Sequence, residues 1–128
     1  MKNAALFLFL LLVLSPLAFA GRLVPVTKAK VTVTTPGTPV VLGLVSEKFF
    51  VASICAETEN TGAVVIGDSS VDATEATRQG DVLWGGTDKA DCLFLGGGDS
   101  SVNGNLADYY VDAESAGEGV VITRYVKD

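Results

Sequence analysis

The chain has 128 residues, with 9 Lys and Arg against 15 Asp and Glu, no His, and a formal net charge of −6. A negative surface of this kind repels phosphate backbones, so nucleic acid is not an expected partner. The absence of histidine excludes Ser-His and Cys-His nucleophile pairs and histidine-zinc sites, and most hydrolase mechanisms with them.

The first twenty residues have the pattern of a cleavable export signal. Lys2 gives a positive start, residues 6–14 are an unbroken apolar run, and an Ala-x-Ala pair ends at Ala20. A retained membrane anchor is the alternative, but the run is shorter than the ~20 residues that cross a bilayer core, and Pro16 would break its helix. We therefore expect removal of residues 1–20, an exported location (periplasmic, cell-surface or extracellular), and no membrane attachment of the mature chain.

Residues 21–27 precede the first predicted strand. This segment contains Pro25 and no evident pairing partner, so we expect an N-terminal arm that docks on a neighbouring subunit. The remaining residues, 28–128, are predicted to form one domain, because about 100 residues bury one core and not two.

The 28–128 segment reads as β-structure throughout. Residues 28–35 alternate Lys or Thr with Ala or Val, the period of a strand with one wet face, and Lys28 and Lys30 discourage unwanted edge pairing. Short strands about ten residues apart, about eight in all, are typical of a sandwich. We predict a single antiparallel β-sandwich, jelly-roll-like, with further strands at 40–42, 49–56, 63–67, 82–84, 93–95, 107–111 and 120–126.

The polar segments between these runs are predicted to be loops. Residues 68–80 read mainly as a long surface loop, with a helical turn over 71–78 as the alternative. The glycines at 85–86 and 96–98 lack the following helix and Lys of a phosphate-binding loop, so they are taken as strand connections. Oxygen side chains between 99 and 108 lack EF-hand spacing, so a solvated turn is favoured over a Ca²⁺ site.

The chain has two cysteines, Cys55 and Cys92. In an oxidising compartment they are expected to form a structural disulfide, and closing a 37-residue loop would stabilise the fold by about 4 kcal/mol. Two unconnected small residues on strands are the alternative, because pairing requires Cα atoms within about 7 Å.

Blocks of this sequence resemble small β-sandwich virion proteins of bacteriophages. They are Asn60–Val71, Gly80–Trp84 and Asn105–Val120, and Tyr110–Val120 (YVDAESAGEGV) is the most specific of them. In such proteins an NTG-apolar-VG segment is followed by a glycine-bearing loop, an L-x-D-x-YVDA-x-x-x-GEGV block and a final strand.

The resemblance covers residues 28–126 and implies capsid decoration or a base for head or tail fibres. The export signal departs from this pattern, because virion proteins of tailed phages normally assemble in the cytoplasm. A domesticated copy, a bacterial surface protein on the same sandwich, or a particle that matures at a membrane would each account for the departure.

Three classes of function remain. An assembly subunit would form homo-oligomers or bind other virion or surface subunits. A secreted binding module would stack Trp84, Tyr109, Tyr110 and Tyr125 on sugars, although the same rings fit a core or a subunit contact. A carboxylate enzyme would need two acids at a defined separation. We predict a non-enzymatic structural subunit with no catalytic residue, metal or cofactor.

Overall fold

The computed structural model describes residues 21–97 and 104–128, and strands make up nearly all of their regular structure. One short 3-10 helix, η1 (Leu106–Asp108), begins after Asn105, whose side chain accepts a hydrogen bond from the Ala107 N–H. The strands are β1 (Leu23–Thr32), β2 (Val40–Val41), β3 (Lys48–Phe49), β4 (Val51–Ala56), β5 (Ala63–Gly67), β6 (Asp81–Trp84), β7 (Cys92–Gly96), β8 (Gly104–Asn105), β9 (Tyr110–Ala113) and β10 (Gly119–Lys127).

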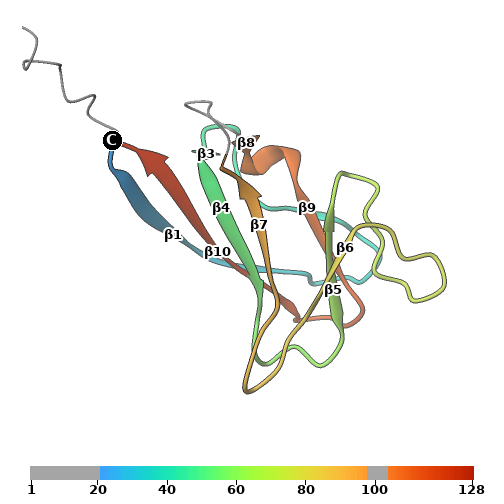
Figure 1. The fold of residues 1–128 in the computed structure, drawn as a ribbon. Coiled ribbons are helices and arrows are strands. Elements are labelled where there is room, and N and C mark those ends of the chain that lie inside the picture. The colour runs from blue at the N-terminus through green and yellow to red at the C-terminus, as the bar shows by residue number, and fades with distance from the viewer. Residues whose placement is uncertain (1–20, 98–103) are drawn as a thin grey trace, which may run out of the picture.

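The strands form two four-stranded antiparallel sheets, sheet A (β1-β10-β4-β7) and sheet B (β2-β9-β5-β6), with a small β3-β8 pair beside them (Figure 1). Apart from that pair, the first strand lies beside the last, β2 beside β9, β4 beside β7, and β5 beside β6. This nested pairing is the jelly roll, a long hairpin rolled into two sheets. The predicted fold class is confirmed, and the two-residue strands β3 and β8 raise the strand count above the expected eight.

We expected residues 21–27 to be an arm without a pairing partner in its own chain, and this expectation is wrong. Residues 23–28 are the first part of β1 and pair with residues 122–127 of β10. No local sequence pattern indicates this partner, because it lies at the other end of the chain. Pro25 is tolerated here because β1 is an edge strand and needs hydrogen-bond donors on one side only.

The core lies between the two sheets. Along β4 the side chains alternate between partly exposed and buried, as the period of two requires, and Ala52, Ile54 and Ala56 point inward. The buried partners of these side chains come from both sheets and are Val64, Ile66, Leu83, Leu106, Val111, Ala113, Val120 and Ile122.

The loop over residues 68–80 covers the outer face of sheet B. Val71 and Ala73 are buried there against Val65, with Val82 and Tyr110 packed beside them. The loop contains turns and a single bridge between Asp72 and Gln79 instead of the alternative helical turn. The predicted long loop is therefore confirmed, and it is fastened to the sheet.

Two carboxylates hold turns within this loop. Asp68 accepts hydrogen bonds from the hydroxyl and the N–H of Ser70, and these bonds lower its pKa. The hydroxyl of Thr77 and the bonds from Thr74 lower the pKa of Asp72 in the same way. Both pKa shifts arise because the hydrogen bonds favour the charged form.

A buried carboxylate ties two loops to sheet B. Asp112 on β9 is fully buried, and its Oδ1 accepts from the N–H of Gly37 while its Oδ2 accepts from the N–H of Ala73, both at 2.9 Å. Gly37 has a φ of 77°, a conformation that favours glycine in this turn. Asp112 thus joins the 36–37 turn and the 68–80 loop at one point.

We expect Asp112→Ala to lower the free energy of unfolding by about 2–4 kcal/mol, because two backbone donors, one of them buried, lose their acceptor. Asp112→Asn is also expected to destabilise, since its amide group would place N–H against one of the two donors. Urea unfolding measures both, with exposed Asp108→Asn as the control. Unchanged stability of Asp112→Asn would contradict the two-donor arrangement.

Candidate interaction surface

Sheet A presents its outer face to solvent, whereas the 68–80 loop covers part of the outer face of sheet B. Phe94 on β7 is 69% exposed and Val121 on β10 is 40% exposed, and the 68–80 loop lies beyond sheet B on the opposite side (Figure 1). We call this surface the open face. It consists of Pro25 and Thr27 of β1, Val121, Thr123 and Tyr125 of β10, Val51, Ser53 and Cys55 of β4, and Cys92 and Phe94 of β7.

The open face contains no charged side chain. Its central row runs across all four strands of sheet A, from Thr27 through Thr123 and Ser53 to Phe94. In a chain with 24 charged residues among 128, ten neighbouring positions without a charge set this surface apart. The nearest charges lie at its ends, where Lys127 contacts the ring of Phe50 and Lys30 pairs with Glu57 at 2.5 Å.

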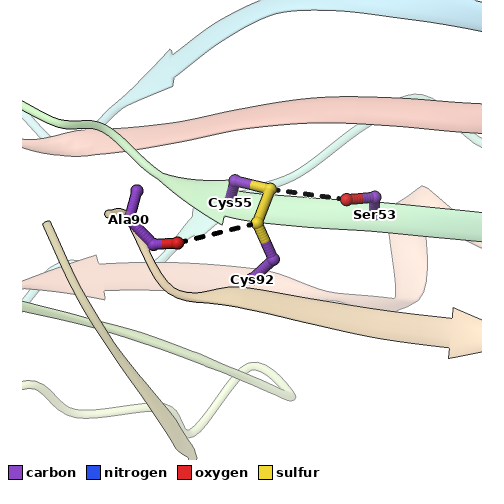
Figure 2. The surroundings of a disulfide bond; sticks show 4 residues. All are labelled: Ser53, Cys55, Ala90 and Cys92. Atoms are coloured by element: carbon purple, nitrogen blue, oxygen red, sulfur yellow. Dashed lines mark hydrogen bonds between the residues drawn. A yellow bond between two sulfur atoms is a disulfide. The ribbon is translucent and has the colours of Figure 1, made fainter. Parts of the chain in front are cut away.

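The predicted disulfide is confirmed and lies on the open face (Figure 2). Cys55 and Cys92 are directly opposite each other on β4 and β7. Because the Ala56 N–H donates to the Asp91 carbonyl, the cysteines occupy the neighbouring non-hydrogen-bonded pair, where side chains approach closely. The disulfide therefore bridges two adjacent strands of one sheet and does not cross the core.

A hydrogen-bond donor lies beside the Cys55 sulfur of the disulfide. The Ser53 hydroxyl donates to the Cys55 Sγ at 3.4 Å. The Cys92 Sγ lies 4.0 Å from the Ala90 carbonyl oxygen, but a disulfide sulfur has no hydrogen to donate (Figure 2). Ile54 and Leu93, the neighbours of the cysteines in sequence, point inward to the core.

Replacing both cysteines, Cys55→Ser with Cys92→Ser, is expected to lower the free energy of unfolding by up to about 4 kcal/mol, the chain-entropy value for a 37-residue loop. Guanidinium unfolding of the native chain with and without a reducing agent should reproduce this loss. The control is the double variant, in which the reducing agent has no target. Equal stability of the native and doubly substituted chains would contradict a stabilising role.

The four predicted contact aromatics do not come together. Trp84 is 48% exposed on the outer face of sheet B, 5.8 Å from the Arg78 guanidinium, and Tyr110 packs against the Val65 cluster there. Tyr109 packs against the core with its ring 6.2 Å from that of Phe49. Of the four, Tyr125 lies on the open face.

Sequence reasoning missed the most exposed ring of the open face, Phe94. It stands inside the apolar run Leu93–Leu95, which we interpreted as a short strand without assigning its faces. Leu93 and Leu95 pack against the core while Phe94 points away from it. The period of two was the available signal, but three consecutive apolar residues conceal it.

The Asn60–Val71 and Asn105–Val120 blocks meet in one hydrogen-bond network. The Asn60 side chain donates to the Gly119 carbonyl at 2.8 Å and accepts from the Gly119 N–H at 3.1 Å. Glu118 Oε1 accepts from the N–H groups of Thr61 and Gly62, both at 2.7 Å, and from the Thr61 hydroxyl. The NTG and GEGV segments therefore hold each other at one end of the sandwich.

Close packing at this junction requires a glycine. A Cβ on Gly119 would lie 2.1 Å from the Val31 carbonyl oxygen, so any other residue would push β10 away from β1. Glu114 extends the network, because it accepts from the Ala63 N–H and pairs with Arg78. The acidic residues of the YVDA-to-GEGV block thus serve as acceptors for backbone donors of other segments.

The described part of the chain has neither a metal-ligand cluster nor a membrane-spanning helix. Among residues 21–97 and 104–128, no group of three or more His, Cys, Asp or Glu is placed to hold a metal ion. No helix in that part of the chain is long and apolar enough to span a membrane. Comparison with protein-family models, with curated proteins and with solved structures finds no match for this chain.

Proposed function

We propose that this protein is a non-enzymatic structural subunit that assembles through surface contacts, in a virion-like particle or in an exported surface or fibre assembly. The observation that carries the proposal is the asymmetry of the sandwich. The 68–80 loop covers part of the outer face of sheet B and leaves Trp84 exposed beside the charged Arg78, whereas the open face of sheet A exposes Phe94 and Val121 and contains no charged side chain. Exposed apolar side chains grouped on one uncharged face are a feature of interaction sites.

The sequence supports the same proposal independently. The blocks that resemble phage virion proteins supply the residues that hold this jelly roll together, including Asn60, Asp112 and Glu118. Jelly rolls occur in viral capsid proteins, although also in lectin domains, so the fold alone does not choose between assembly and sugar binding.

Export is part of the proposal and has its own support. Residues 1–20 have the pattern of a signal peptide, and the Cys55–Cys92 disulfide is compatible with an oxidising compartment. An exported subunit would need stability outside the cell, and the disulfide contributes to it by restricting the unfolded chain.

Sugar binding is the second candidate, and one feature of the open face favours it. The exposed ring of Phe94 lies in the same cross-strand row as the hydroxyls of Ser53, Thr123 and Thr27. An aromatic ring beside hydroxyl groups can stack on a pyranose and bond to its edge. Binding to polysaccharides by a chain that stays monomeric would favour this function over assembly.

Assembly is tested on the full chain expressed with its own leader and collected as the cell exports it. We expect light scattering after size exclusion to give multiples of the subunit mass, with the mean mass rising as the protein concentration increases. Negative-stain electron microscopy then shows whether the product is a ring, filament or shell. A single-subunit mass at every concentration would overturn the proposed function.

A further inference from the structure

We propose that a second copy of this chain docks face to face on the open face of sheet A. This inference rests on the proposed assembly function and names the surface and the partner that it uses. It makes the sandwiches stack as folded units, through side chains and without exchange of backbone hydrogen bonds.

The edges of sheet A are poorly suited to pair with another chain. The β1 edge contains Pro25, which has no N–H, and its register shifts between Lys28 and Val31. At the opposite edge β7 is short and ends at Gly96, which has a φ of 86°. Both features interrupt the regular ladder that strand addition needs, so the face is the better docking surface.

The outer face of sheet B is partly occupied, and its exposed Trp84 lies beside the charged Arg78. Val71 and Ala73 of the 68–80 loop lie buried on it, and Asp112 fastens that loop through the Ala73 N–H. A partner would have to displace the loop and leave a buried carboxylate without one of its donors. Docking on the open face does not require displacement of this loop.

Charge favours another copy of the same chain at this position. The chain has a net charge of −6, so two copies repel each other over most of their surfaces. The open face is where they can meet without bringing like charges together, because none of its side chains is charged. Replacing water between two such faces removes apolar surface such as Phe94 and Val121 on both copies at once.

The size of the open face predicts a weak pairwise contact. Four strands about 4.8 Å apart and rows about 7 Å apart give a patch of roughly 400 Å² on each copy. A standard stable interface uses about 800 Å² on each partner. Pairing at this face is therefore expected to depend on protein concentration and to need further contacts for a closed assembly.

The turn after β2 provides a matched control surface. Leu44 is 67% exposed, close to the value for Phe94, and lies outside sheet A on a turn in which the Glu47 carboxylate accepts from its N–H. A charged substitution at either position changes a side chain that is already in solvent. Both variants are therefore expected to fold.

The test compares Phe94→Asp and Val121→Asp with Leu44→Asp, all made in the full exported chain. We expect either open-face variant to weaken self-association about tenfold or more in sedimentation equilibrium, because each contact would bury a carboxylate against an apolar surface. Leu44→Asp should associate like the native chain. Thermal unfolding and an intact disulfide confirm that each variant is folded.

A photo-crosslinking benzophenone side chain in place of Phe94 identifies the occupant of the face. The expected product is a dimer whose cross-linked peptide contains open-face residues of a second copy, such as those around Val121 or Thr123. Cross-linking to a different protein, or unchanged association of both open-face variants, would overturn the inference and leave the assembly function standing. A native chain that is monomeric at every concentration would contradict both the face-to-face docking and the assembly function.

Discussion

The register of β4 against β7 is the constraint on which the open face depends. In this register Ile54 and Leu93 face the core while Cys55 and Cys92 meet on the outside. Because side chains alternate along a strand, a slip by one residue would turn every inward side chain of β7 outward and separate the cysteines. The disulfide therefore does more than restrict the unfolded chain. It selects the one register in which sheet A buries its aliphatic side chains and presents Phe94.

The loops are held in place by hydrogen bonds to carboxylates, just as the register of β4 against β7 holds sheet A in place. Asp112, Glu114 and Glu118 all accept hydrogen bonds from backbone N–H groups of segments distant in sequence. Each such carboxylate satisfies donors that no strand ladder reaches, so short loops can be held closely against the sandwich. This use gives the acidic side chains at 112, 114 and 118 a structural role.

The fold class could be predicted from sequence because the alternating pattern is local. The runs at 49–56, 63–67 and 120–126 became β4, β5 and β10 with small changes at their ends. The arm at 21–27 could not be recognised as a strand, because its partner is the last strand of the chain and no local pattern shows that pairing. In the 107–111 segment the Asn105 side chain caps η1, and this local hydrogen bond delays the strand to Tyr110. For the open face, the sequence predicted the disulfide and Tyr125 but not Phe94, whose outward direction depends on register.

The outer faces of the two sheets differ in how far the chain itself covers them. This difference affects how copies can associate. The outer face of sheet B is partly covered by its own chain, because the 68–80 loop packs on it when the subunit folds. Sheet A has protected edges and a bare face, so it resists strand addition but still has apolar surface to bury. Association through that face leaves both hydrogen-bond ladders and the β4–β7 register unchanged. Subunits can then fold independently, be oxidised, and assemble afterwards, which is the order that an exported building block requires.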